Sequence, residues 1–177
     1  MDENQTLFRK PEERKISLED YYQAERQGEE SPLQFCVRMG WEAYIHEMLI
    51  VDYLILNRDR HGANIELLIG RKDKNIRPAP LFDHGLSFVC RCHTESDLQD
   101  FDVMEDKKIQ SFVGSDSAWE NLNLVSAYSL KKLPPLKKNA FGGLFDGLED
   151  ALSKKHLSVI RRMLEKRWET VENLRHS

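Results

Sequence analysis

The segment Asn57–Asn64, with the sequence NRDRHGAN, decides the fold and the chemistry of this chain. It supplies an aspartate, Asp59, and five residues later an asparagine, Asn64. A second aspartate, Asp83, follows 19 residues after Asn64 and precedes a histidine and a glycine. Two carboxylates and an amide oxygen that converge at strand ends suit Mg²⁺, which prefers oxygen ligands and takes the remainder from water and substrate phosphates.

These three side chains match the roles that phosphoryl transfer requires. That reaction needs one aspartate near the attacking hydroxyl group, and an asparagine and an aspartate that hold the metal against the phosphates. We therefore predict Asp59 beside the hydroxyl group, with Asn64 and Asp83 on the metal. Gly85 is predicted to let the backbone turn tightly after the metal ligand.

The elements around this motif follow from the pattern of apolar residues. Residues 41–56 carry apolar side chains at three- and four-residue steps, and the second half is apolar nearly all round, which predicts a central helix with neighbours on several sides. Ile65–Ile69 is predicted as a strand, and Ile76–Phe82 as a second strand that completes a β-hairpin on the central helix. Because Pro78 and Pro80 cannot donate to a ladder, we expect the second strand at an edge.

Further helices are predicted on both sides of this unit. They cover residues 17–27, 117–129 and 153–174, and the first two begin at serines that can cap a free backbone N–H. Residues 90–116 are acidic, and we expect them to be rich in loops.

The chain has 177 residues, which is enough for one domain with its own core. Residues 1–16 are charged and unpatterned, so we expect a loose N-terminal arm or linker there and one domain over residues 17–177. The predicted fold class is mainly α with a small β-hairpin at the functional site.

The composition argues against several classes of protein. The net charge of −4 and the isoelectric point near 5.9 disfavour broad affinity for nucleic acid. The most apolar stretch, Met48–Leu56, contains Asp52 and is far shorter than the roughly 20 residues of a membrane-spanning helix. The N-terminus lacks the pattern of a secretory signal, and the three cysteines lack the spacing of a disulfide framework. We therefore expect a cytoplasmic protein that binds neither nucleic acid directly nor a membrane.

Two motifs carry a resemblance to a known family. Asp59–Asn64, with the pattern D-R-H-x-x-N, resembles the catalytic loop shared by HipA-like kinases and phosphoinositide kinases. Ala79–Gly85, with the sequence APLFDHG, resembles the A-P-L-[YF]-D run of the HipA-like family, which places its metal-binding aspartate there. The resemblance covers residues 41–88 and implies the C-terminal catalytic lobe of a HipA-like serine/threonine protein kinase.

The resemblance implies a role for each motif residue and two cofactors, ATP and Mg²⁺. Asp59 would be the catalytic base or would orient the hydroxyl group, and His61 would brace the loop and touch the transferring phosphate. Asn64 and Asp83 would bind Mg²⁺ and, together with Arg60, the nucleotide. Arg60 could instead pair with a neighbouring carboxylate on the surface. The acceptor would be a serine or threonine of a protein substrate, and kinases of this family often pair with an antitoxin that binds DNA.

The sequence also departs from the pattern of a complete kinase. No G-x-G-x-x-G loop lies upstream of the motif, and no strand like V-A-I-K carries a lysine that pairs with phosphates. The residues before Asn57 are polar and partly helical, which does not suit a sheet-based N-terminal lobe. We therefore expect a protein-kinase-like C-lobe without an N-lobe, weak or inactive alone. It would derive from a longer kinase or work with another chain that supplies the missing lobe.

Two alternatives to a protein kinase stay open. The acceptor could be a phosphoinositide or another small molecule, although Ala79-Pro80 and the acidic residues 90–106 disfavour this. The chain could also be a non-catalytic, pseudokinase-like interaction module, which the missing glycine-rich loop and lysine favour.

A short cysteine-rich segment, Cys90-Arg91-Cys92-His93, raises the question of a zinc site. Such sites take four ligands, commonly from C-x₂₋₄-C pairs. Here a C-x-C pair with an adjacent histidine has no second pair, so we predict no zinc at this position.

Overall fold

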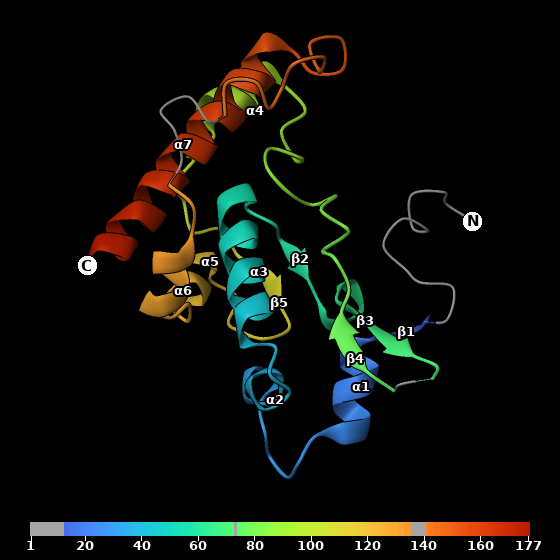
Figure 1. The fold of residues 1–177 in the computed structure, drawn as a ribbon. Coiled ribbons are helices and arrows are strands. Elements are labelled where there is room, and N and C mark those ends of the chain that lie inside the picture. Colours follow the sequence, from blue (N-terminus) through green and yellow to red (C-terminus); the bar gives the residue numbers. More distant parts are fainter. Residues whose placement is uncertain (1–12, 73, 136–140) are drawn as a thin grey trace.

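Seven α-helices and two small sheets make up the described part of the chain, which covers residues 13–72, 74–135 and 141–177 of a computed structural model (Figure 1). The helices are α1 (Leu18–Glu25), α2 (Pro32–Arg38), α3 (Glu42–Ile55), α4 (Glu95–Asp100), α5 (Ala118–Leu122), α6 (Ala127–Lys132) and α7 (Lys154–His176). The strands are β1 (Glu13–Ser17), β2 (Asp59–Arg60), β3 (Glu66–Gly70), β4 (Ile76–Pro78) and β5 (Gln110–Ser111), with a 3₁₀ turn, η2 (Gly62–Asn64), between β2 and β3.

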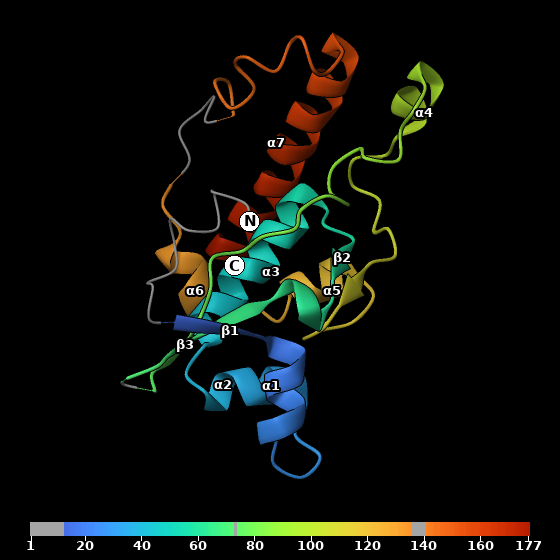
Figure 2. The same cartoon turned by 90° about the vertical axis from the view of Figure 1, so that its right-hand side faces the viewer.

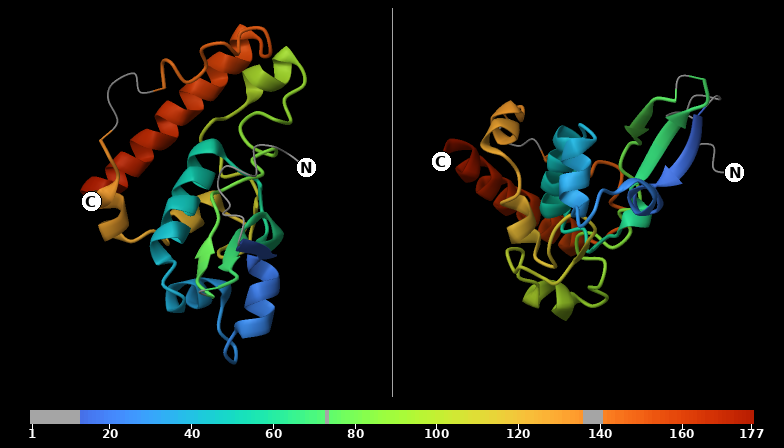
Figure 3. Two further views of the ribbon diagram at one scale, coloured as in Figure 1. Left: turned by 45° about the vertical axis from the view of Figure 1, so that its right-hand side comes forward. Right: turned by 90° about the horizontal axis from the view of Figure 1, so that it is seen from below.

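The central helix α3 forms where the apolar pattern predicts it. It packs against α2, α5, α6 and α7, which explains why apolar residues occupy nearly all of its faces. It lies between α7 on one side and the three-stranded sheet on the other (Figure 3). The helix ends at Leu56, whose φ of 51° places the next residues in a new direction. The NRDRHGAN motif therefore begins directly after a buried helix.

The predicted hairpin is the β3–β4 part of a sheet with the order β1-β3-β4. The antiparallel pairing places Leu67 opposite Pro78, and β4 lies at an edge, as the prolines predict. The strand stops at Pro78 rather than continuing to Phe82. Ala79 makes the last ladder bond, from its N–H to the carbonyl of Glu66, and Pro80 has no N–H to continue the ladder.

The expectation of a loose arm over residues 1–16 is wrong for its last four residues, because they belong to β1. This strand pairs along its whole length with β3, from Glu13 opposite Gly70 to Ser17 opposite Glu66. The cross-strand ion pair of Lys15 with Glu66, at 2.8 Å, adds to the backbone ladder. Because charged side chains dominate this stretch, it lacks the alternating pattern by which strands are recognised. Residues 1–12 lie outside the described residues.

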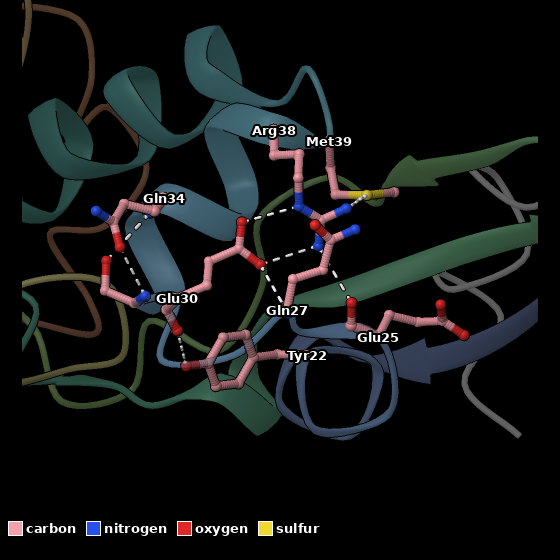
Figure 4. Close-up of polar contacts among 8 residues, drawn as sticks. Tyr22, Glu25, Gln27, Glu30, Gln34, Arg38 and Met39 are labelled. Carbon is pink, nitrogen blue, oxygen red and sulfur yellow. Dashed lines mark hydrogen bonds and ion pairs between the residues drawn. The ribbon is translucent and has the colours of Figure 1, made fainter.

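Helices α1 and α2 form a pair joined by a polar turn, which Figure 4 shows in detail. Ser17 caps α1 as predicted, and α2 has a reciprocal capping box between Ser31 and Gln34. Arg38 reaches back from the end of α2 and donates from Nε and Nη2 to the carboxylate of Glu30, at 2.8 and 2.9 Å. These local bonds hold the hairpin of helices that covers one end of the sheet.

One predicted helix, over residues 117–129, is in fact two short helices, α5 and α6. Ser117 caps the first, and Ser126 caps the second by accepting a hydrogen bond from the N–H of Ser129. A second cap inside an apolar segment favours a new helix start over continuation. The acidic residues 90–116 contain α4 and β5, and β5 pairs in parallel with β2 next to α5 (Figure 2).

The helix predicted over residues 153–174 is confirmed as α7, and Ser153 caps it. Its buried face contacts α3, α4 and α6 and includes Met163, Leu164 and Val171. None of the helices in the three described ranges is long and apolar enough to cross a membrane.

Candidate functional site

The NRDRHGAN segment forms a short loop that bridges α3 and β3. Parallel pairing with β5 supports it from one side, since Arg58 accepts a hydrogen bond from the N–H of Gln110 and Arg60 accepts one from Phe112. The segment after Asp83 supports it from the other side, because the N–H of Arg58 donates to the carbonyl of Leu86. Residues distant in sequence thus hold the loop on both sides.

Asp59, the predicted catalytic residue, is anchored through its backbone while its side chain stays accessible. Buried Asn57 donates from Nδ2 to Asp52 Oδ1, at 3.0 Å, and accepts the N–H of Asp59 on Oδ1, at 3.2 Å. The side chain of Asp59 is 32% exposed. His61 lies beside it, with Nε2 3.9 Å from Asp59 Oδ1. The two residues predicted to be catalytic are therefore neighbours at the surface of the loop.

Arg60 corrects one of the predicted roles, because its side chain points into the core. It is only 1% exposed, and its Nε and Nη2 form a bidentate pair with the carboxylate of Asp52, both at 2.9 Å. Its remaining donors reach the carbonyls of Asn64 and Phe82 and the Nδ1 atom of His84. All five N–H groups of the guanidinium have partners, so none is left for a nucleotide phosphate. Arg60 is a positioning residue: it pairs with a carboxylate, as the alternative expects, but in the core and not on the surface.

The same guanidinium brings the two predicted metal ligands into one region. Arg60 Nη1 lies 3.1 Å from the carbonyl oxygen of Asn64 and 2.8 Å from that of Phe82, which directly precedes Asp83. Because one nitrogen atom bonds both carbonyls, the end of η2 and the segment after β4 are held together. The hairpin thus returns the segment that precedes Asp83 to the backbone of Asn64.

Asn64 and Asp83 offer oxygen atoms that suit Mg²⁺. The Nδ2 atom of Asn64 donates to the carbonyl of Asp59, at 2.9 Å, which orients the amide. No hydrogen bond to Asn64 Oδ1 occurs within the described ranges, and Asp83 is exposed. Those ranges also hold no group of three or more His, Cys, Asp or Glu side chains that could bind a metal. One amide oxygen and one carboxylate still fit Mg²⁺, which usually keeps several waters and binds substrate phosphates.

The tight turn at this segment falls on Asp83 and not on Gly85, which corrects a further prediction. Asp83 has a φ of 54°, in the left-handed region, whereas Gly85 has no positive φ. Aspartate tolerates this conformation better than most residues, but other contacts must hold it there. The bond from Arg60 to Phe82 on one side and that to His84 on the other restrain the turn.

Sequence reasoning missed two members of this network, Asp52 and His84. Asp52 is a buried charge on an otherwise apolar helix, and that contrast is a signal of a paired role. His84 accepts a hydrogen bond from Arg60 Nη2 on Nδ1, at 3.1 Å, so its proton resides on Nε2. Burial and the positive charge of Arg60 lower the pKa of His84. Both effects favour the neutral form of the histidine.

Comparison with known proteins supports a kinase-like fold. No protein-family model matches the chain, and no curated protein matches its sequence. Among solved structures, the chain is similar to that of a kinase, with a TM-score of 0.68 over 93% of this chain and 71% of the other. That protein is CtkA, a proinflammatory kinase of Helicobacter pylori.

The two sequences are 15% identical, so the likeness concerns the fold and not the motifs. The fold is a mixture of α-helices and two small sheets, rather than mainly α with a single hairpin.

Proposed function

We propose that this chain catalyses phosphoryl transfer from ATP, with Mg²⁺, to a serine or threonine hydroxyl group of a protein. The observation that carries the proposal is the Arg60 clamp, which joins the segments of Asn64 and Asp83 beside the anchored loop of Asp59. The kinase-like fold supports the same class of reaction.

Within this proposal, each residue of the loop has a physical role. Asp59 faces solvent on a backbone held by Asn57, so it can accept a hydrogen bond from an incoming hydroxyl group and then its proton. His61 beside it can restrain the carboxylate. Asn64 Oδ1 and the Asp83 carboxylate would hold Mg²⁺. Bound Mg²⁺-ATP would supply the transferable phosphoryl group, with the metal neutralising charge on the phosphates.

The proposal includes a partner, because the sequence contains neither a glycine-rich loop nor the lysine of a V-A-I-K strand. We infer that another chain or segment supplies these groups, and that an antitoxin-type protein is a further partner. The isolated chain should therefore bind nucleotide weakly. Binding tighter than micromolar would contradict this, because two metal ligands in open solvent offer too little binding energy.

Calorimetric titration of the purified chain with Mg²⁺-ATP tests the proposal. We expect weak heat of binding that disappears without Mg²⁺ and in Asp83→Asn, which removes one charge and little volume. The matched control is Asp116→Asn, because the ion pair of Asp116 among the described residues is the one with exposed Lys108, at 3.1 Å. Equal binding by the wild type and Asp83→Asn would reject Asp83 as a metal ligand.

A non-catalytic interaction module is the second candidate, and the missing glycine-rich loop and lysine favour it. Under this function, the chain would keep its fold but bind no nucleotide, even when a partner chain is present. Retained binding of that partner by Asp59→Asn together with Asp83→Asn would support it.

A further inference from the structure

Cys90 contacts the loop that carries Asp59. Its Sγ atom lies 2.8 Å from Nη2 of Arg58, the residue before Asp59. Backbone bonds to Leu86 and Gln110 fix Arg58 on both sides. The position of this sulfur is therefore tied to a rigid part of the candidate site.

The guanidinium of Arg58 has no carboxylate partner within the described residues. Its Nε atom is buried and makes no hydrogen bond to any described residue. The cation therefore lies against a partly exposed sulfur atom, and no described carboxylate competes for it. Reactive cysteines sit in electropositive, partly exposed surroundings of this kind.

Cys92 lies two residues further along and has a different environment. Its Sγ donates to the carbonyl of Asp97, at 3.8 Å, and burial raises its pKa, although the charge of Arg58 acts in the opposite direction. Two residues span at most about 7 Å between their Cα atoms. The N–H of Cys92 donates to the carbonyl of Val89, and the turn that this bond closes shortens the distance further. The two cysteines are therefore within the Cα separation that a disulfide requires.

We propose that Cys90 is a site of oxidation by hydrogen peroxide and that Cys92 is the thiol that resolves it. The Cys90 sulfur attacks one peroxide oxygen, the O–O bond breaks, and the thiol proton leaves with the other oxygen as water. Sulfur is oxidised to a sulfenic acid while the peroxide is reduced. The Cys92 sulfur then attacks the Cys90 sulfur, an S–S bond forms, and the S–O bond breaks. The Cys92 proton leaves with the oxygen as water.

Oxidation would remove the sulfur from Arg58, which then loses a hydrogen-bond partner next to Asp59. An effect of this change on phosphoryl transfer rests on the function proposed above. Oxidation of Cys90 and Cys92 does not rest on that function, so it is tested by the mass of the peptides and not by activity.

The test treats the full chain with hydrogen peroxide and then with dimedone, which traps sulfenic acids, before mass spectrometry of its peptides. In the wild type we expect a loss of two hydrogen atoms from the peptide that contains both cysteines. In Cys92→Ser we expect the dimedone adduct on Cys90 instead. Cys36 is the internal control, because it is fully buried and burial raises its pKa to about 12. Equal oxidation of Cys36 and Cys90, or no adduct on Cys90 in Cys92→Ser, overturns the proposal.

The contribution of Arg58 is tested with Arg58→Gln, which keeps most of the length and removes the charge. Alkylation of Cys90 by iodoacetamide should slow about tenfold relative to the wild type. An unchanged rate at Cys90 in a folded variant would overturn the role of the guanidinium. If Arg58→Gln does not fold, the Cys92→Ser experiment decides alone.

Discussion

Two fully buried arginines, Arg60 and Arg167, organise two different regions of this molecule, and both are only 1% exposed. Arg60 pairs with the carboxylate of Asp52, and each of its five guanidinium N–H groups has an acceptor. Arg167 on α7 instead donates to the backbone carbonyls of Val103, Tyr53 and Glu105, at 2.9, 3.0 and 3.1 Å. Its guanidinium also lies 4.9 Å from the centre of the Tyr53 ring.

The difference lies in how each charge is compensated. Arg60 has a buried anion at hydrogen-bond distance, whereas the groups that contact the Arg167 guanidinium within the described residues are carbonyl dipoles and a ring face, and the Asp102 and Asp106 carboxylates act on it without an ion pair. Burial accordingly lowers the pKa of Arg167. A paired buried charge depends strongly on its partner, whereas an unpaired one leaves no opposite charge behind when it is removed. The comparison predicts unequal costs for the same substitution at the two positions.

The largest effect is expected for Arg60→Met. The variant leaves the Asp52 carboxylate buried without its cation, which should lower the free energy of unfolding by about 3–5 kcal/mol. Urea denaturation followed by tryptophan fluorescence measures the loss. The double variant Asp52→Leu with Arg60→Met should recover part of it, because no unpaired charge then remains buried. An equal or larger loss in the double variant would contradict the ion-pair account.

A smaller loss, about 2–3 kcal/mol, is expected for Arg167→Met. Three carbonyls lose their donor, but the cost of burying an unpaired guanidinium is relieved at the same time. The same denaturation experiment measures it. Weak Mg²⁺-ATP binding should survive in this variant and be lost in Arg60→Met. A loss at Arg167 that exceeds the loss at Arg60 would break the comparison.

Gly62 tests how tightly the Arg60 region is packed. A Cβ atom at this position would lie 2.6 Å from Glu19 Cβ and 2.8 Å from the ring of Phe112, so Gly62→Ala should cost about 1–2 kcal/mol. The matched control is Gly85→Ala, where the nearest atom, Asp83 Oδ1, lies at an ordinary 3.6 Å. Thermal unfolding of both variants should show a loss for Gly62→Ala alone.

The smallest effect concerns pH and His84. Because burial and Arg60 lower its pKa in the folded chain, the unfolded chain binds the proton more readily. This contribution to stability is therefore present above the ordinary histidine pKa and is lost as the pH falls through the lowered value. The substitution His84→Asn keeps a hydrogen-bond acceptor near the position of Nδ1, but its amide side chain does not titrate. The variant should show a flatter decline of stability below neutral pH, measured by urea denaturation, and an unchanged decline would contradict the role of His84.

Much of the framework could be predicted because its signals are local. The apolar stripes of α3 and α7, the serine caps and the prolines of β4 each act through residues close together in the chain. The β1 strand could not be predicted, since its residues are charged and its ladder bonds come from β3. The break between α5 and α6 was missed because the cap at Ser126 interrupts a segment that is otherwise compatible with one helix.

The sequence by itself determined which oxygen atoms are available for a metal and how far apart Asp59, Asn64 and Asp83 lie along the chain. Only the tertiary structure decided that Arg60 turns inward and that the left-handed turn falls on Asp83. The physical reason is that the acceptors of one guanidinium come from α3, from the end of η2 and from the segment after β4. Such a set exists only after these three parts of the chain have packed together.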